Sequence, residues 1–349
     1  MVAPVAAHSA SAATERAFTG FGEATVFNVQ YGIPGFILTD KFVDHGGPTS
    51  QALFESAGGR RANAQIPYIG YMADYPGFPP LVAAALGLPQ PPSLPAYAAR
   101  ASADDSGQPE QVVGEEGGPY FLKATASSTA VRSTARLGAP EGKDGAQPPA
   151  SLATTDVVTD GDKVSVVAST VAQSFSLGPL SVADMRSKSV TTYTQGDDQP
   201  VTTTELLVKG GSVGTTSFSF GAGGLKVAEN GVPVPAGEEL SQLNGALAPA
   251  GLTVNFAGAR TVPGGAAAGT FEIVDTHPVP GAAKDAHGIF RVRFGGVVSS
   301  VGLGNATSGE STATVSAPSD TSPRAAAEPV RSFGRLAAWR PQAAEEVAT

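Results

Sequence analysis

The strongest constraint on the fold is the alternation of apolar and polar residues in the stretch 161–224. From Leu180 to Tyr193 the odd positions, among them Met185, are small or apolar, whereas the even positions include Arg186 and Lys188. A period of two is typical of a strand with one buried face and one wet face. The stretch therefore predicts antiparallel sheet.

The run 202–209 repeats this arrangement, with Leu206 and Val208 on the face predicted to be buried. Between the two runs, residues 196–200 (GDDQP) have the composition of a hairpin connection. A register slip of one residue would expose both apolar side chains, so we expect a well-specified register.

Shorter alternating runs predict further strands on both sides of this stretch, and Asn230-Gly231 predicts a tight hairpin whose second arm, with Pro233, lies at a sheet edge. We expect irregular chain from 33 to about 53, Pro-rich loops covering the sheet over 67–94, a polar surface loop over 102–118 and a flexible insertion over 138–149. The remaining predicted strands are Glu23–Gln30, Tyr120–Leu137, Leu252–Phe256, Phe271–Val274 and Ile289–Val301.

One helix is predicted, over residues 238–248. Leu240, Leu243 and Leu247 fall on one helical face, and Pro249 with Gly251 ends the segment. A strand follows directly, so we expect the helix to pack on the sheet.

These elements predict a mainly β fold, a large antiparallel sheet or β-sandwich with one packed helix. We expect a single β-rich domain over 19–304, a disordered or export-signal segment over 1–18, and a disordered tail over 305–349. The alternative is two smaller β domains joined through 138–149.

Composition excludes several functional classes. The formal net charge of −9 and the lack of a basic stripe in the predicted domain argue against nucleic-acid binding. The sequence has no cysteine, so disulfides and thiolate chemistry are excluded. Apolar runs fall short of the roughly 18 residues of a transmembrane helix.

Residues 210–214 match the G-x-S-x-G pattern of a hydrolase nucleophile elbow, with Ser212 as the nucleophile. Acid and imidazole residues follow in the order that α/β-hydrolases use. However, an elbow needs a helix directly after the serine, and the sequence there predicts a strand and a glycine turn. We therefore interpret the match as accidental, and predict that Ser212 reaches no histidine.

Asp275, His277, Asp285 and His287 are a local group of acid and imidazole residues that could ligate a divalent metal. The simpler interpretation is a solvated Pro/Gly-rich loop between strands, so we predict no metal, no cofactor and no catalytic residue.

Other acidic groups have simple interpretations. Asp160-Gly161-Asp162 lacks the glutamate that completes an EF-hand and is predicted to be a turn. The pairs Asp104-Asp105, Glu115-Glu116 and Asp197-Asp198 are predicted to be solubilising loop residues.

Both termini carry signals of their own. Ala10-Ser11-Ala12 has the small-x-small pattern of a signal-peptidase site, which indicates either the end of an export signal or a disordered terminus. Asn305-Ala306-Thr307 is a glycosylation sequon, meaningful only in a eukaryotic secretory pathway. The segment 330–340 predicts a short basic amphipathic helix, and weak membrane-surface contact would involve Phe333, Leu336 and Trp339.

Several stretches, 86–101, 174–193, 204–227 and 240–254, resemble uncharacterised secreted or cell-envelope proteins of high-GC Gram-positive bacteria (actinobacteria). This resemblance implies export, an extracellular or envelope location and a β-rich protein without a known reaction. We expect a non-enzymatic envelope protein with a structural or interaction role, whose partners are other envelope components. The alternative is a carrier that holds a lipid or other apolar ligand between a curved sheet and the helix.

Overall fold

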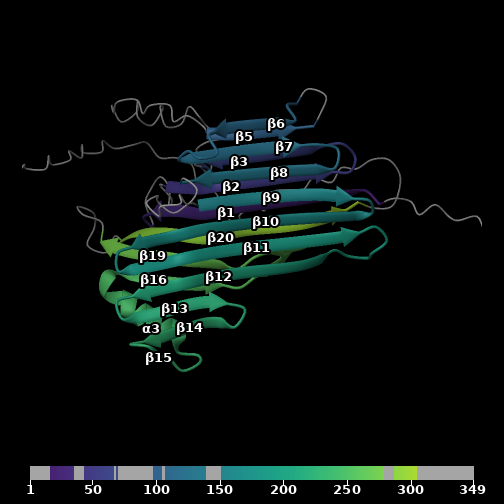
Figure 1. Cartoon of the computed structure of the whole chain (residues 1–349). Coiled ribbons are helices and arrows are strands. Elements are labelled where there is room, and N and C mark those ends of the chain that lie inside the picture. Colours follow the sequence, from purple (N-terminus) through teal and green to yellow (C-terminus); the bar gives the residue numbers. More distant parts are fainter. Residues whose placement is uncertain are drawn as a thin grey trace, which may run out of the picture. The chain divides into compact units, whose positions relative to one another are not determined.

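The computed structural model describes residues 16–34, 43–66, 68–69, 97–103, 107–138, 151–278 and 287–304. Within these ranges the chain forms two large antiparallel sheets and one α-helix (Figure 1), so the prediction of a mainly β fold is confirmed. Contacts divide the chain into the units 1–313 and 314–349, and every described residue belongs to the first.

Sheet A has the strand order β16-β19-β20-β1-β2-β3-β5, with β4 beside β2 and the β17–β18 hairpin beside β20. Its strands are β1 (Phe18–Gly32), β2 (Val43–Glu55), β3 (Arg60–Ile66), β4 (Tyr68–Ile69), β5 (Tyr97–Ser102), β16 (Leu252–Ala257), β17 (Arg260–Val262), β18 (Gly265–Ala267), β19 (Thr270–Pro278) and β20 (His287–Leu303).

Sheet B is a meander in which each strand pairs with its neighbours in sequence (Figure 1). Its strands are β6 (Glu110–Gly114), β7 (Tyr120–Ala126), β8 (Ala130–Leu137), β9 (Ser151–Asp160), β10 (Lys163–Leu177), β11 (Leu180–Thr194), β12 (Val201–Val213), β13 (Thr216–Gly221), β14 (Gly224–Glu229) and β15 (Val232–Pro233). The helix α3 (Glu239–Leu247) and the 3-10 turn η1 (Ala248–Ala250) follow sheet B and lead back into sheet A. The first and last strands of the described ranges, β1 and β20, therefore both lie in sheet A and pair with each other.

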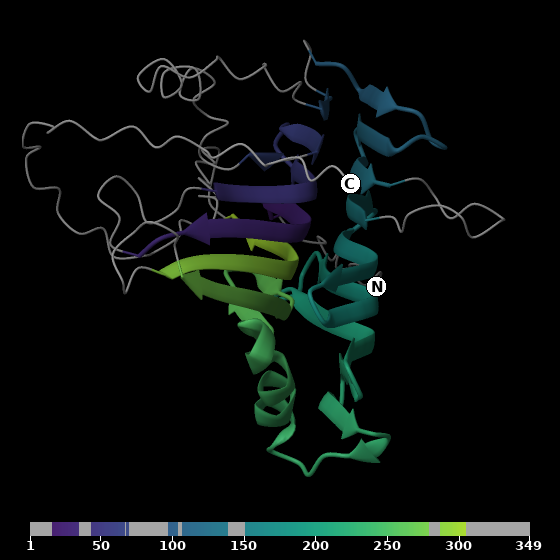
Figure 2. The same ribbon diagram turned by 90° about the vertical axis from the view of Figure 1, so that its left-hand side faces the viewer.

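The two sheets pack face to face (Figure 2) around two groups of buried side chains. One group, the phenylalanine cluster, lies beside α3 and includes stacked rings with centroids 4.5 and 4.7 Å apart and a tilted pair 4.9 Å apart. Its rings are Phe27, Phe175, Phe218, Phe220, Phe256, Phe271 and Phe294. The other, the alanine cluster, lies between β2, β3 and β5 and the facing strands of sheet B, and contains Ala52, Ala62, Ala64, Ala99, Ala101, Ala124, Ala126 and Ala135.

A set of buried hydroxyl groups, the hydroxyl seam, joins the sheets by hydrogen bonds. It consists of Ser50, Ser133, Thr155, Ser187, Ser189, Thr191 and Ser299. Thr191 Oγ1 in sheet B donates to the carbonyl oxygen of Ser299 in sheet A at 3.0 Å, and Ser50 Oγ donates to the carbonyl of Ser133 at 2.9 Å. Buried hydroxyls with good partners fix one arrangement of the two sheets.

Part-way along several strands, the buried side chains switch from even-numbered to odd-numbered positions, or the reverse. In β11 both Val182 and Met185 are buried, whereas Ala183 between them is exposed. The neighbouring strands change at the same level, where Ser174 and Gly210 have positive φ of 38° and 60° and a β-bulge shifts the β12–β13 register. In β20, Phe294 and Gly295 are both buried, and Gly295 has a φ of 87°. Bulges of this kind turn a strand over by one residue.

Several predicted elements are confirmed. The helix spans Glu239–Leu247, and Leu243 and Leu247 are fully buried, although Leu240 is 39% exposed. The Asn230-Gly231 hairpin joins β14 to β15, with both residues at positive φ as a tight hairpin requires. The edge position of Pro233 and the 196–200 hairpin between β11 and β12 are also confirmed.

Four predictions about the sheets were wrong. The run Tyr120–Leu137, expected to be one strand, forms two antiparallel strands, β7 and β8. The region expected to be irregular up to 53 contains β2, in which Gly47 and the cis Gly47-Pro48 bond interrupt a strand that continues to Glu55. The expected polar loop 102–118 contains β6. Strict alternation placed Ala183 on the buried face, and the bulge at this level exposes it. In addition, β8 and β9 pair with each other across the insertion 138–149, so this segment does not separate two β domains.

Candidate functional site

Ser212 lies in β12 and points away from the interior. Gly211 and Val213 on either side of it are buried, and its hydroxyl shares a hydrogen bond with Ser181 Oγ at 2.8 Å. The next element is β13, which pairs with β12, whereas an elbow serine precedes a helix. A Cβ on Gly211 would lie 2.4 Å from the Phe218 ring, so packing explains this glycine. The G-x-S-x-G segment is thus a bulged strand that enters a hairpin.

Asp275 and His277 were expected in a loop, and the structure instead places both in β19. Residues two apart on a strand share a face, and here Asp275 Oδ2 lies 3.5 Å from His277 Nδ1. This contact is an ion pair only when the imidazole is protonated, because a neutral imidazole carries no charge. Nδ1 is buried and makes no hydrogen bond within the described part of the chain. The two side chains are 33% and 40% exposed.

Tyr31 of β1 stacks on His277, with ring centroids 5.9 Å apart and planes 8° apart. Gly288 of β20 makes room for both rings, since a Cβ there would lie 2.8 Å from Tyr31 Oη and 2.9 Å from His277 Nε2. His287 lies beside Gly288 in β20, and Asp285 lies outside the described residues. In the described ranges, no group of three or more His, Cys, Asp or Glu side chains is placed to hold a metal ion.

Tyr31, Asp275 and Gly288 surround the imidazole of His277 and orient it. A carboxylate beside Nδ1 favours the tautomer that leaves Nε2 free to accept a proton, as in hydrolytic enzymes. Nucleophilic catalysis also needs a nucleophile in hydrogen-bond reach of that imidazole, and Ser212 bonds to Ser181. The structure therefore places a carboxylate and an imidazole side by side on one face of β19.

The acidic turns lie where the sequence indicated. Asp160-Gly161-Asp162 forms the turn between β9 and β10, with Gly161 at φ 58°, and Asp197-Asp198 lies in the turn before β12. Glu115 and Glu116 lie in the β6–β7 turn, while Asp104 and Asp105 are outside the described residues.

Three residues with shifted pKa values, Glu23, Asp156 and Arg136, carry no motif in the sequence. Burial raises the pKa of Asp156 in β9, and the charge of Arg132 partly opposes that shift. Burial raises the pKa of Glu23 in β1, and a side-chain hydrogen bond to Gln51 partly opposes the shift. Glu23 stands opposite Gln51 across β1–β2, and Asn63 Nδ2 of β3 lies 3.5 Å from Gln51 Oε1. The sequence signal that could have identified Glu23 is a single carboxylate on a strand whose other residues carry no charge.

Desolvation also lowers the pKa of Arg136 in β8, against the opposing effect of Glu116. Its guanidinium donates to the carbonyl oxygens of Gly118 at 3.2 Å and Glu115 at 3.4 Å, and to those of Glu116 and Gly138. Arg136 thereby holds the β6–β7 turn against β8.

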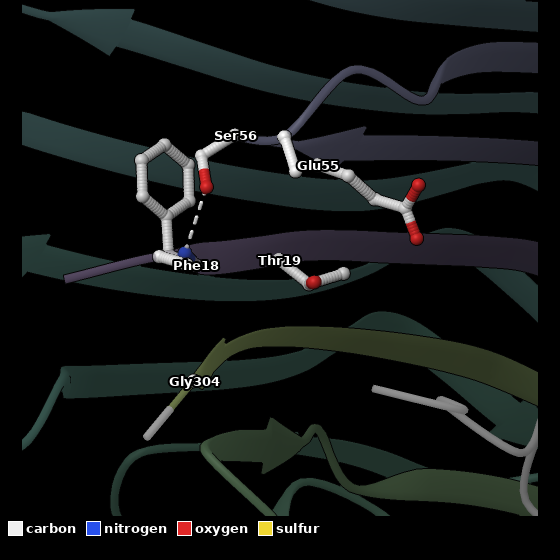
Figure 3. A pocket seen from close by; sticks show the side chains of 7 residues that line it. Phe18, Thr19, Glu55, Ser56 and Gly304 are labelled. Carbon is white, nitrogen blue, oxygen red and sulfur yellow. Dashed lines mark hydrogen bonds between the residues drawn. The ribbon is translucent and has the colours of Figure 1, made fainter. Parts of the chain in front are cut away.

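A small pocket lies where β1 begins and β20 ends (Figure 3). The backbone N–H of Phe18 donates to Ser56 Oγ at 3.0 Å on its wall. Its volume of about 70 Å³ suits about two waters, well below the roughly 300 Å³ of small ligand sites. The lining residues are Ala17, Phe18, Thr19, Glu55, Ser56, Ala57 and Gly304.

Several predicted features lie outside the described residues: the N-terminal segment 1–15, the Pro-rich segment 70–96, the sequon at Asn305 and the amphipathic segment 330–340. None of the helices in the described ranges is both long and apolar enough to cross a membrane.

Comparisons with known proteins add little. No family model matches the chain, and no curated protein matches it. Among solved structures, the outer membrane protein opdK from Pseudomonas aeruginosa aligns with a TM-score of 0.17 and 10% identity, over 82% of this chain and 98% of that chain. OccK9 (OpdG), also from Pseudomonas aeruginosa, aligns with a TM-score of 0.16 and 12% identity, over 83% and 99%. Scores this low do not indicate a shared fold.

Proposed function

We propose that this chain is a non-enzymatic, exported cell-envelope protein with a structural or interaction role. The observation that carries the proposal is the filled interior: the chain's own side chains occupy the space between the sheets, and hydroxyl hydrogen bonds bridge it. A domain of this kind offers its outer surface to partners. Export and envelope location rest on the sequence resemblance and on Ala10-Ser11-Ala12. Fractionation of producing cells tests them, and retention in the cytosol would contradict them.

The alternative of a lipid carrier has less support from the described residues. A carrier needs more apolar lining than its own core can fill. The site expected between helix and sheet is occupied by Leu243 and Leu247 of α3, which pack with the phenylalanine cluster.

Native mass spectrometry of the purified protein tests the structural role against the carrier. We expect the mass of the polypeptide alone, and an organic extract without a stoichiometric lipid. One lipid per chain, retained through purification, would favour the carrier instead.

A fluorophosphonate probe tests the non-enzymatic assignment. We expect no labelling, because the hydroxyl of Ser212 bonds to Ser181 on the outer face of sheet B. The matched control is Ser212→Ala. Labelling of the natural protein that disappears in this variant would show a serine nucleophile and overturn the assignment.

A further inference from the structure

Two asparagines in this chain are followed directly by glycine, in the pairs Asn230-Gly231 and Asn244-Gly245. In such a pair the backbone nitrogen of the glycine can attack the side-chain amide of the asparagine, because glycine has no Cβ to hinder the approach. Asparagine is counted among the thermolabile residues. The remaining asparagines are followed by valine, alanine or phenylalanine. The sequence alone does not distinguish the two pairs, but their surroundings in the fold differ.

Asn230 and Gly231 form the two-residue turn between β14 and β15, and both are exposed. The ladder between these strands ends at the pair of Glu229 with Val232, so neither turn residue is part of it. Within the described ranges, the side-chain amide of Asn230 makes no hydrogen bond, and a Cβ built on Gly231 would meet no atom within 4 Å. The amide and the nitrogen that would attack it are therefore both open to solvent.

The turn must open before the two groups can react, because the hairpin holds both residues at positive φ, 50° and 81°. Little holds its second arm in place. β15 is two residues long and lies at the end of sheet B, Pro233 has no N–H to donate, and Val232 is 67% exposed. Segments with few buried contacts open locally at a low cost in free energy. The hairpin can therefore open while the rest of the domain stays folded.

Asn244 lies within α3, and both polar atoms of its side chain are bonded. Its Oδ1 accepts a hydrogen bond from the backbone N–H of Val254 at 2.7 Å, and its Nδ2 donates to the Val254 carbonyl oxygen at 3.2 Å. The N–H of Gly245 lies inside the helix, where it donates to the carbonyl four residues earlier. Leu243 and Leu247 hold α3 in the core with no exposed surface. A reaction at this pair would require the helix to unfold.

We propose that Asn230 is a site of spontaneous deamidation, and that the fold protects Asn244 from the same reaction. In the first step the Gly231 nitrogen forms a bond to Asn230 Cγ and gives up its proton, and the side-chain nitrogen leaves with that proton as ammonia. A cyclic succinimide remains. In the second step water, the sole co-reactant, adds to one of the two ring carbonyl carbons and breaks its bond to nitrogen, which leaves aspartate or isoaspartate. This inference is independent of the proposed function.

Peptide mapping by mass spectrometry compares the two sites within one chain, so Asn244 is the matched control. The natural protein is incubated in mildly alkaline buffer, with a parallel sample in guanidinium chloride. Conversion replaces NH₂ by OH and adds about 1 Da to the peptide. In the folded protein we expect Asn230 to convert at least about tenfold faster than Asn244, because only the hairpin opens locally. In denaturant we expect similar rates at both sites.

A variant locates the reaction. Asn230→Gly removes the side-chain amide and keeps the turn, because glycine accepts the positive φ at this position. In the natural protein, a form with one more negative charge should accumulate and separate by anion exchange. The same form should not accumulate in Asn230→Gly.

The isoaspartate product tests the local opening. Isoaspartate adds one carbon to the main chain, so a two-residue turn cannot keep its geometry. Hydrogen exchange of the isolated isoaspartate form should therefore be faster at residues 229–233 and unchanged in α3. Faster exchange throughout α3 would show that the hairpin does not open by itself, and would overturn the proposal.

Two further results would also overturn it. One is similar conversion of Asn230 and Asn244 in the folded protein. The other is an Asn230 that stays intact in native buffer over the time in which it converts in denaturant, because the hairpin would then protect this amide as well as the helix protects the other.

Discussion

Glu23 is a carboxylate whose environment disfavours its charge. Because burial raises its pKa above the ordinary value, ionised Glu23 destabilises the fold at pH values above the raised pKa, and this cost disappears as the pH falls toward the unfolded value of about 4.5. Glu23→Gln should therefore raise the free energy of unfolding at pH 7, with a gain that shrinks toward pH 4. Urea titrations from pH 4 to pH 8 measure it.

Glu205→Gln, at an exposed position of β12, controls for the loss of one negative charge. A Glu23→Gln gain that is equally large at pH 4 and pH 7 would show that the carboxylate itself is not the source.

Gly22 is required by the close approach of the sheets. A Cβ at this position would lie 2.4 Å from Thr155 Cγ2, which is buried in β9. Gly22→Ala should therefore destabilise the fold by about 1–3 kcal/mol through overpacking. The matched control is Gly117→Ala, where a Cβ would meet nothing within 4 Å. Thermal unfolding measures both, and equal effects would exclude the close approach as the cause.

The sequence identifies candidate site residues more readily than it predicts the contacts between them. Spacing alone puts Asp275 and His277 on one face of a strand, once the segment is recognised as a strand and not a loop. The stacking of Tyr31 on His277 depends on the pairing of β1 with β20, between residues more than 250 positions apart, so local pattern cannot supply it. Glu23 and Arg136 carry no motif, and their pKa shifts come from burial.

At the scale of elements, the hydroxyl seam joins β11 to β20. Thr191 Oγ1 donates to the Ser299 carbonyl in the buried interior. Thr191→Val keeps the shape and leaves that carbonyl without this donor, so we expect a loss of about 1–3 kcal/mol. Thr192→Val, on the outward face of the same strand, controls for the change in strand propensity. Urea unfolding measures the free energy of unfolding of the two variants. Similar losses in both would contradict a stabilising role for the hydroxyl seam.

Alternation predicts strands reliably where the strand is regular and where its buried face is much more apolar than its exposed face. It identified β12 and β20, and turn residues identified the β11–β12 and β14–β15 hairpins. It failed in β2, where Gly47 and Pro48 resemble a loop, and at Ala183, where a bulge changes the buried face. The alanine cluster also weakens the contrast between the two faces of a strand, because alanine is only weakly hydrophobic yet fills much of this interior. Bulges and small buried residues limit what a period of two can reveal.

At the scale of the whole molecule, the pairing of the first and last strands joins distant parts of the chain. β1 and β20 are neighbours in the middle of sheet A, and all of sheet B lies between them in sequence. Hairpin signals predict neighbours in a meander, and they identify the β11–β12 and β14–β15 connections of sheet B. The central pairing of sheet A depends on contacts across the whole domain and has no local signal.

This connectivity predicts the behaviour of a chain cut between β8 and β9. A protease site inserted in 139–150 would leave fragments that still share the β8–β9 and β1–β20 pairs and both buried clusters. We expect the two fragments to co-elute in size exclusion after cleavage, and to separate only in denaturant. A chain with the same insertion but without protease treatment is the control. Calorimetry of the cut protein should give one cooperative transition, since neither fragment retains a complete interior. Two fragments that separate in native buffer and unfold independently would mean that the sandwich is two domains.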